Sequence, residues 1–362
     1  MNQKLDGSQS SAVQDALWDA FAVSSQDIAK LKIIESSIYL TRKCNIACQY
    51  CKIIKTELPE ELTTEQWMEA FDILDSLGIR FVNIAGGEPT IVKGLGTLIG
   101  HLNHETSMKY SLVSNSIFND RKLEELVDAG LKTFVASVDV MEDGVIDLDV
   151  LRKSNAGLKM LKKLQARGVP ELCGNIVING LNINNVMSVV HYLNDNGFWT
   201  SICPIVWGKG DKWEEPEKAD ESYRLTEAHK NKLEEIANEL LLMKEKGGLI
   251  LPTESYIKNM TTFGIGCNWK CYTEKNSPNP PRLFIDADGS IMSCINFRGD
   301  TASKYSIFDF RDVSVYEKFI HEWWDAVSDC AGCYWSTMYM AKERQDMAYG
   351  IQQKIAGNIS PD

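Results

Sequence analysis

The sequence predicts an α/β protein built on a partial (β/α)6, TIM-like barrel, followed by a smaller α+β unit. Three observations lead to this fold class. From residue 36 to about 207, short β-branched segments alternate with amphipathic helical segments, which is typical of a parallel sheet with crossover helices. Six such strands are too few to close like an eight-stranded barrel. After Trp207 the alternation stops and a segment of different composition begins.

The six expected strands are short, apolar and bounded by turn residues, and they cover residues 36–41, 81–85, 110–114, 133–138, 175–179 and 200–206. The helices between them have recognisable ends. Thr63 and Gln66 form a capping box, and Gly78 ends the helix that follows. Gly168 and Gly197 end two later helices in the same way. Apolar residues repeat on one face of each helix, in the first one at Trp67, Phe71, Leu74 and Leu77.

The domain boundaries follow from these changes of pattern. We expect an N-terminal helical extension over residues 1–35, the barrel over 36–208, a connector with one long helix over 209–248, and a second unit over 249–362. The connector is charged, and its helix is expected over 226–246. In the second unit, the run from Asp286 to Gly289 lies between two apolar segments and predicts a tight hairpin turn.

The composition excludes several classes of protein. A hydrophobic fraction of 44% with 24% charged residues is ordinary for a globular protein. No apolar run approaches the about 18 residues of a membrane span, and the N-terminal residues do not resemble a signal peptide, so we expect a cytoplasmic protein without a membrane partner. A net charge of −12 opposes tight binding to nucleic acid. Ten cysteines in such a chain indicate reduced thiols used as ligands.

Cys44, Cys48 and Cys51 form the most informative motif of the chain. The spacing C-x3-C-x2-C offers three thiolates from one short loop. Three thiolates can hold three irons of a [4Fe-4S] cube and leave the fourth iron open for chemistry. Zinc is the alternative, but a structural zinc site uses four ligands, and no histidine lies near these cysteines in the sequence.

Tyr50 precedes the last of these cysteines, and the resulting pattern C-x3-C-x-aromatic-C resembles the signature of the radical S-adenosylmethionine (SAM) superfamily. The resemblance implies that the open iron chelates the amine and carboxylate of SAM and that Tyr50 lies near the adenine. It also implies a partial barrel with the cluster loop after the first strand. The second expected strand ends in Gly86, Gly87, Glu88 and Pro89. This run resembles the GGEP motif of the same superfamily, whose backbone and Glu hold the methionine amine of SAM. Taken alone, it could be a strand-ending turn with Glu88 in solvent.

Polar residues at the ends of the later strands are further candidates for SAM binding: Ser114, Asn115, Ser137, Asp139, Arg152, Asn175 and Asn179. Members of this superfamily often use a Ser and a downstream Arg for the SAM carboxylate and ribose, so the resemblance assigns these roles to Ser137 and Arg152. Asn175 and Asn179 could reach the adenine or ribose, or could cap a strand. The five histidines have no metal-like spacing and are expected to be structural or at the surface.

A second set of cysteines lies in the C-terminal unit: Cys271, Cys294, Cys330 and Cys333. Their order, with Gly289 before Cys294, resembles the auxiliary-cluster unit of SPASM/Twitch radical SAM proteins and implies a second [4Fe-4S] cluster. Because no cysteine follows Cys333, the resemblance favours the Twitch type with one auxiliary cluster. A zinc site with four thiolates would use the same ligands and stays open.

Three cysteines remain outside these sets. Cys267 could replace Cys271 as a ligand, donate a hydrogen atom beside the cluster, or have no role, and we favour Cys271 as the ligand. Cys173 and Cys203 lie in barrel segments and are expected to be ordinary core residues.

The resemblance implies a radical SAM enzyme. An external donor such as flavodoxin or ferredoxin would reduce the first cluster, and SAM would be cleaved to methionine and a 5′-deoxyadenosyl radical that abstracts a hydrogen atom from the substrate. We expect a two-electron oxidation of a small molecule such as an alcohol or aminosugar, because neither end of the chain has room for a fused leader-binding domain. Radical modification of a ribosomal peptide, by epimerisation or crosslinking, is the alternative. A non-catalytic electron-transfer or zinc-binding protein is the alternative from another class.

Overall fold

The computed structural model describes residues 32–51, 60–140, 148–206, 221–271, 279–294, 304–327, 330 and 332–346. Nearly all of the expected extension over 1–35, and the charged residues 209–220 of the connector, lie outside these ranges. None of the helices in the described ranges is long and apolar enough to cross a membrane.

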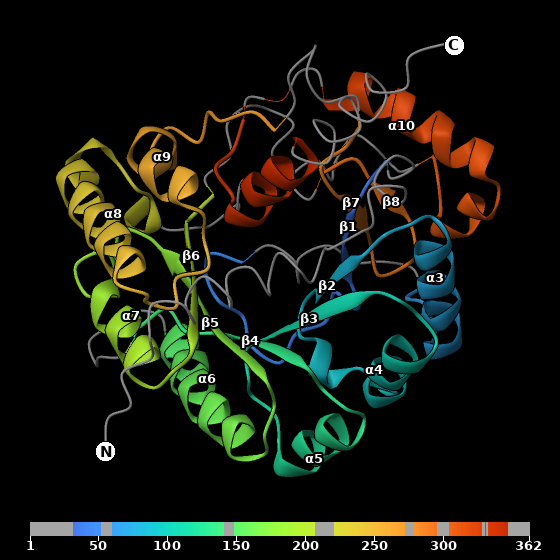
Figure 1. Ribbon diagram of the computed structural model, residues 1–362, viewed down its shortest axis with the longest axis horizontal. Coiled ribbons are helices and arrows are strands. Elements are labelled where there is room, and N and C mark those ends of the chain that lie inside the picture. The colour runs from blue at the N-terminus through green and yellow to red at the C-terminus, as the bar shows by residue number, and fades with distance from the viewer. Residues whose placement is uncertain are drawn as a thin grey trace, which may run out of the picture.

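A parallel sheet forms the core of the fold. Its first six strands are β1 (Glu35–Tyr39), β2 (Phe81–Ala85), β3 (Lys109–Ser114), β4 (Thr133–Ser137), β5 (Glu171–Ile178) and β6 (Trp199–Pro204). Neighbours in the chain are neighbours in the sheet, and all five pairs are parallel. Figure 1 shows the six strands as a curved, open arc, which confirms the predicted partial barrel.

Five crossover helices lie along the outer side of this arc in Figure 1: α3 (Thr64–Ser76), α4 (Leu95–His104), α5 (Asp120–Asp128), α6 (Leu148–Ala166) and α7 (Val186–Asp195). The expected capping box of α3 is present. Thr63 Oγ1 accepts from Gln66 N at 3.3 Å, and Gln66 Oε1 accepts from Thr63 N at 2.9 Å. The apolar face of α3 is buried at Trp67, Phe71 and Leu74.

The strand β5 begins at Glu171, earlier than the expected start at residue 175. Gly174 obscures this start, because glycine weakens a strand pattern. In the structure, a Cβ at Gly174 would overlap the side chain of Leu193 in α7. The glycine therefore allows α7 to pack closely on β5.

Two further helices, α8 (Lys230–Glu245) and α9 (Glu254–Gly264), lie beside β6 in Figure 1. The helix expected over 226–246 begins with a 3-10 turn at Glu227–His229, because Thr226 N donates to His229 Nδ1 at 3.0 Å and fixes a separate first turn. The buried face of α8 is the expected one, with Leu233, Ile236, Ala237 and Leu240.

The expected hairpin is formed by β7 (Leu283–Ile285) and β8 (Ile291–Met292), with Gly289 at φ +83° in its turn. This hairpin joins the barrel sheet, because β7 pairs in parallel with β1. The sheet order is therefore β6-β5-β4-β3-β2-β1-β7-β8. The helix α10 (Val313–Val327) and a helical segment over residues 336–346 follow.

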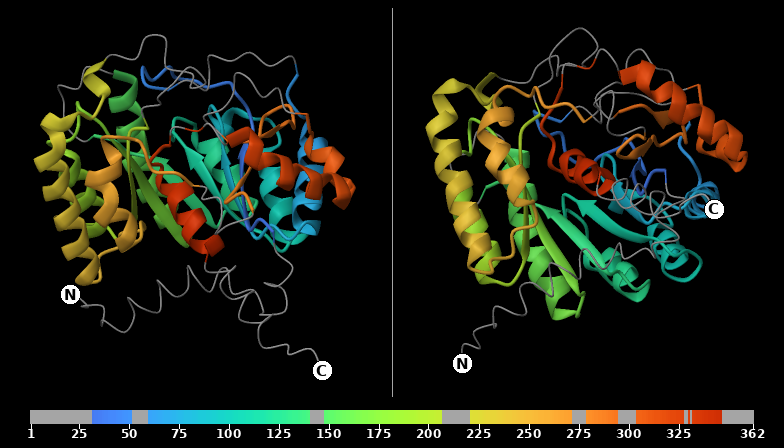
Figure 2. Two further views of the ribbon diagram at one scale, coloured as in Figure 1. Left: turned by 90° about the horizontal axis from the view of Figure 1, so that it is seen from above. Right: turned by 45° about the horizontal axis from the view of Figure 1, so that its top comes forward.

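The helical segment over 336–346, drawn in red in Figure 2, lies in the opening between β6 and β1. At one end, Ser336 N donates to Cys203 Sγ of β6 at 3.5 Å. At the other end, Arg344 pairs with Glu35 of β1, which also pairs with Arg282. The C-terminal part of the chain therefore connects the two edges of the six-stranded arc.

Candidate active site

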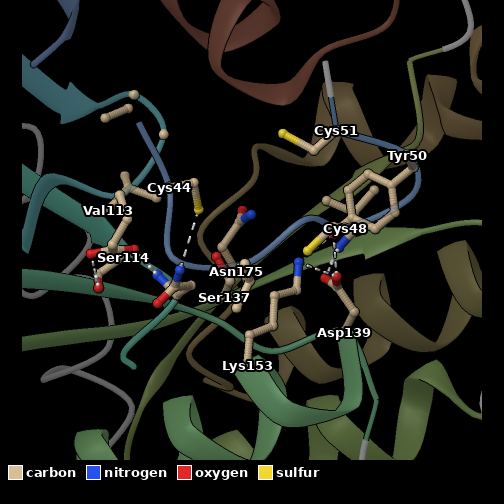
Figure 3. A pocket seen from close by; sticks show the side chains of 17 residues that line it. Cys44, Cys48, Tyr50, Cys51, Val113, Ser114, Ser137, Asp139, Lys153 and Asn175 are labelled. Atoms are coloured by element: carbon tan, nitrogen blue, oxygen red, sulfur yellow. Dashed lines mark hydrogen bonds and ion pairs between the residues drawn. The ribbon is translucent and has the colours of Figure 1, made fainter. Parts of the chain in front are cut away.

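A cavity of about 210 Å³ lies at the carboxyl ends of β2 to β5. Cys44, Cys48 and Cys51 line it from the loop after β1, as Figure 3 shows. None of these three cysteines forms a disulfide in the described part of the chain. A turn with Cys51 N donating to Cys48 O at 3.0 Å shapes the loop, and Asn45 Nδ2 fixes it by donating to Ile117 O at 2.7 Å. The fold therefore brings the three predicted thiols to one cavity.

Gly86 and Gly87 bring the loop after β2 against the backbone of the cysteine loop. Gly87 N donates to Thr41 O at 2.7 Å, and Glu88 N donates to Lys43 O at 2.9 Å. Gly86 has φ +135°, and a Cβ at either glycine would overlap a carbonyl oxygen of the cysteine loop. These glycines therefore allow one loop to pack on the other. Both also line the cavity, so their close approach to a ligand remains a prediction.

The carboxylate of Glu88 is fully buried and accepts four hydrogen bonds from the protein. Oε1 accepts from Thr90 N at 3.0 Å, from Thr90 Oγ1 at 2.6 Å and from Ser114 Oγ at 2.7 Å. Oε2 accepts from Asn115 N at 2.7 Å. Burial raises the pKa of this carboxyl group, although the hydrogen bonds act in the opposite direction. Glu88 thus joins the loop after β2 to the end of β3, and its contact with the SAM amine remains a prediction.

Asn115 connects the same strand end to the cysteine loop. Its Nδ2 donates to Asn45 Oδ1 at 2.7 Å and lies 3.7 Å from Cys44 Sγ. Its Oδ1 accepts from Ile117 N at 2.9 Å, which fixes the orientation of the amide. Burial raises the pKa of the Cys44 thiol, and ligation of a metal would favour the thiolate instead.

The half-buried Tyr50 and the buried Asp139 and Lys153 form a polar group on one wall of the cavity (Figure 3). Tyr50 Oη donates to Asp139 Oδ2 at 2.6 Å, and Lys153 Nζ pairs with the same oxygen at 2.8 Å. Nζ also donates to Tyr50 Oη and lies 4.9 Å from the ring centre. Burial alone would lower the pKa of Lys153, but Asp139 and Tyr50 raise it well above its usual value, so the ammonium keeps its charge. Burial and Asp139 also raise the pKa of Tyr50.

Arg152 is a candidate for SAM binding from the sequence, and its neighbour Lys153 is not. Arg152 is exposed and does not line the cavity, whereas Lys153 does. Successive residues of a helix point about 100° apart, so Arg152 points well away from the direction of Lys153. The helical phase contains the missing signal, because Val150 and Gly157, three residues before and four after Lys153, are buried on its face.

Ser137 lines the cavity from the end of β4 and Asn175 from the carboxyl half of β5, and both are labelled in Figure 3. Asn179 does not line it. Its Oδ1 accepts from Leu181 N at 2.9 Å, and its Nδ2 donates to Val177 O at 3.3 Å. Asn179 therefore shapes the turn after β5, which is the strand-capping alternative.

The second set of predicted ligands comes together from three separate segments: Cys271, Cys294, Cys330 and Cys333. The thiol of Cys333 interacts electrostatically with the other three, and that of Cys271 with Cys294 and Cys330. Burial raises the pKa of both thiols. Cys333 N donates to Trp269 O at 2.7 Å, which holds two of the segments together.

Cys267 has different neighbours. Its Sγ lies 3.6 Å from Gly264 O and 3.9 Å from Ile205 O, and its thiol interacts with that of Cys203. Cys267 is buried and does not line the cavity at the first cysteine set. The geometry therefore groups Cys271 with the other three thiols, and the choice of Cys271 over Cys267 as a ligand stays a prediction.

Among the described residues, no group of three or more His, Cys, Asp and Glu side chains converges as it would around a single metal ion. A tetrahedral zinc site requires such convergence. In a [4Fe-4S] cube, each thiolate binds a different iron, so the sulfurs lie further apart. The described residues therefore show no preassembled site for a single ion, and the zinc alternative at the second cysteine set stays open.

The remaining candidates are structural or lie at the surface. His101 pairs with Asp72 and His191 with Glu239, both at 2.7 Å. His229 takes part in the turn before α8, and His104 and His321 are exposed. Cys173 and Cys203 are buried, and burial raises the pKa of Cys173 to about 12. These outcomes confirm the expectations for both residue types.

The fold is a partial parallel barrel whose cysteine-lined cavity lies at the carboxyl ends of the strands, where functional groups gather in α/β proteins. Residues 38–193 match the family model of the radical SAM superfamily. The chain therefore carries a radical SAM domain, as the cysteine motif predicts.

Curated relatives match part of the chain, and two of them follow. The chain is 27% identical to GTP 3′,8-cyclase of Aquifex aeolicus (strain VF5), over 46% of this chain and 54% of that protein. It is 28% identical to the sporulation killing factor maturation protein SkfB of Bacillus subtilis (strain 168), over 45% of this chain and 40% of that protein. The chain thus spans about half the length of the curated relatives it matches.

The fold extends the likeness over most of the chain. It is similar to the crystal structure of Streptococcus suis SuiB bound to S-adenosylmethionine, with a TM-score of 0.63 at 16% identity, covering 96% of this chain and 82% of that chain. At this identity, the likeness concerns the fold, and it confirms the predicted architecture.

Proposed function

We propose that the protein is a radical SAM enzyme that binds a [4Fe-4S] cluster at Cys44, Cys48 and Cys51 and cleaves SAM reductively. The observation that carries this proposal is the meeting of three cysteine side chains with the loop after β2 in one cavity at the strand ends. The cluster would supply the electron that breaks SAM into methionine and a 5′-deoxyadenosyl radical, which takes a hydrogen atom from the substrate.

The side chains of the cavity would bind and orient SAM. Ser137 and Asn175 offer hydrogen bonds from the strand ends, and Lys153 offers a fixed positive charge. A buried ammonium suits the SAM carboxylate, which is the role that the family resemblance suggested for Arg152. Tyr50 is held by Asp139 and stays a candidate for contact with the adenine.

Anaerobic reconstitution followed by chromatography of the products tests this activity. With dithionite, the parent protein should convert SAM to 5′-deoxyadenosine, whereas Cys48→Ala should lose both the cavity cluster and this product. Cys173→Ala is the matched control, because it removes a buried thiol of β5 that lies outside both cysteine sets. If Cys48→Ala retains the activity, the assignment of the site is wrong.

The second cysteine set is proposed to hold one auxiliary [4Fe-4S] cluster. Its four thiols come from the C-terminal segments, and their mutual electrostatic interaction supports a common ligand. Such a cluster would accept the second electron of an oxidation: the substrate loses a hydrogen atom to the radical, then one electron to the cluster and one proton to a base.

We propose a peptide as the first candidate substrate. The support is that SkfB is named as a maturation protein of a killing factor, and that SuiB, whose fold this chain resembles, has been crystallised with the precursor peptide SuiA. Small-molecule oxidation, the expectation from the sequence, stays the second candidate, because GTP 3′,8-cyclase is also a relative. The flavodoxin or ferredoxin donor and the cytoplasmic location remain predictions.

Mass spectrometry distinguishes the outcomes. A short peptide encoded beside the gene should lose two hydrogen atoms on incubation with enzyme, SAM and dithionite if it is oxidised or crosslinked. A peptide of unchanged composition that gains deuterium at carbon in heavy water would indicate epimerisation instead. If neighbouring peptides are unchanged while a small molecule is oxidised, the peptide proposal is wrong.

A further inference from the structure

Two buried ion pairs connect β1 to β7, one at each end of these parallel strands. Near the amino ends, Glu35 pairs with Arg282. Beyond the carboxyl ends, Arg42 pairs with Asp286 through two hydrogen bonds, one of them from Nε to Oδ1 at 2.7 Å. All four side chains are at most 6% exposed. The two pairs are therefore alike in burial and differ in place, and Glu35 has Arg344 as a second partner.

The Arg42–Asp286 pair lies between the two cysteine-bearing segments. Arg42 precedes Cys44 by two residues, and Asp286 begins the turn that leads through β8 to Cys294. The carbonyl oxygens on either side of Arg42 accept the hydrogen bonds from the loop after β2. The ion pair thus connects the first cysteine loop, and the loop packed on it, to the hairpin of the second cysteine set.

A third segment, residues 60–62, contacts both the first cysteine loop and the hairpin. Glu61 Oε1 accepts from Arg42 N at 2.9 Å, and Leu62 N donates to Ala287 O at 2.8 Å. Residues 60–62 therefore hydrogen-bond to the backbone of Arg42 and to the backbone of Ala287, which follows Asp286. Because the surrounding backbone is fixed, loss of one charge leaves the other in place and buried.

We propose that the Arg42–Asp286 pair positions the first cysteine loop on the auxiliary hairpin and balances charge beside the first cluster. A [4Fe-4S] cluster gains one negative charge on reduction. A lone Arg42 cation would favour that reduced state, and a lone Asp286 anion would oppose it, because the interaction of two charges depends on their signs. Removal of the Asp286 anion should therefore favour the reduced cluster, and removal of the Arg42 cation should disfavour it. This inference rests on the proposed cluster at Cys44, Cys48 and Cys51.

A redox titration followed by electron paramagnetic resonance tests the charge balance, using the cluster signal that changes on addition of SAM. Asp286→Asn should raise the ratio of reduced to oxidised cluster at a fixed potential about tenfold, which corresponds to about 59 mV for a one-electron couple. Arg42→Gln should lower the ratio by a similar factor, and the double variant should return it close to that of the parent. Arg282→Gln breaks the matched pair at the far ends of the strands and should leave the ratio unchanged.

Two results would overturn the proposal: shifts of the same sign in Asp286→Asn and Arg42→Gln, or an equal shift in Arg282→Gln. Arg42→Lys keeps the charge but loses the two-bond geometry. It should therefore keep the parent potential while hydrogen exchange becomes faster in residues 41–51 and 284–294. A parent protein that binds no cluster would refute the proposed function, whereas bound clusters without opposite shifts would refute this inference alone.

Discussion

Replacement of Gly87 by alanine tests whether the site is built by the packing of two loops. A Cβ at Gly87 would overlap Lys43 O and lie 2.9 Å from Arg42 C. Both neighbours are backbone atoms of the cysteine loop, so neither can rotate away as a side chain could. The loop after β2 must therefore move away from the cysteine loop.

The cost follows from the contacts that this movement breaks. Gly87 N to Thr41 O at 2.7 Å and Glu88 N to Lys43 O at 2.9 Å would be lost or stretched, at about 1 kcal/mol each. Displacement of a packed backbone adds about 1–3 kcal/mol. We expect Gly87→Ala to lower the free energy of unfolding by about 3–5 kcal/mol, and to reduce the iron bound at the first cysteine set.

Gly100→Ala in α4 is the matched control, because no atom lies within 4 Å of the added Cβ. In a helix interior, this change should stabilise the protein by about 0.5–1 kcal/mol. Chemical unfolding and iron analysis of both variants provide the measurement. If Gly87→Ala binds iron and unfolds like the parent, the loop packing does not form the site.

Three further predictions concern other contacts. Cys271→Ala should remove about half of the about eight irons expected from two clusters, whereas Cys267→Ala should retain them in an iron assay. Lys153→Met should destabilise the protein by about 3–5 kcal/mol, because it leaves a buried carboxylate without its cation, while the exposed Arg152→Met should stay within about 0.5 kcal/mol in the same unfolding assay. Burial alone would raise the pKa of Glu35, but two arginines lower it below its usual value of 4.5. Its stabilisation is therefore present above pH 4.5 and is lost as the pH falls through the lower folded pKa. The stability difference between parent and Glu35→Gln should narrow over that range in unfolding curves, and a constant difference would contradict this cause.

The local features of the fold could be predicted because neighbouring residues determine them. The capping box at Thr63, the hairpin turn at Gly289 and the six strands each depend on a few adjacent side chains. The cysteine loop is equally local, since its three predicted ligands lie close together in the sequence. Even here the predicted start of β5 is wrong by several residues. Gly174 weakens the strand pattern in the sequence, and only the structure shows that this glycine allows α7 to pack on β5.

The features that sequence reasoning missed depend on contacts between distant segments. Nothing near Leu283 indicates that β7 pairs with β1, because parallel pairing is fixed by the whole arrangement of the sheet. The choice of Lys153 over Arg152 depends on the rotation of α6 relative to the cavity. Likewise, Cys267 and Cys271 have the same chemistry, and only the position of the segment after α9 distinguishes their neighbours.

The motif residues of the second loop have a packing task beside the ligand contact that their resemblance implies. Gly87 and Glu88 line the cavity and also hydrogen-bond to protein groups, whereas Ser137, Asn175 and Lys153 line the same cavity from outside the motif. We therefore expect the motif residues to support construction of the site as well as contact with the ligand. Variants of the motif residues should lose iron and SAM affinity together, because they displace the cysteine loop. Variants of the residues outside the motif should weaken SAM binding while iron remains bound, so the order in which the two properties fail distinguishes the two kinds of residue.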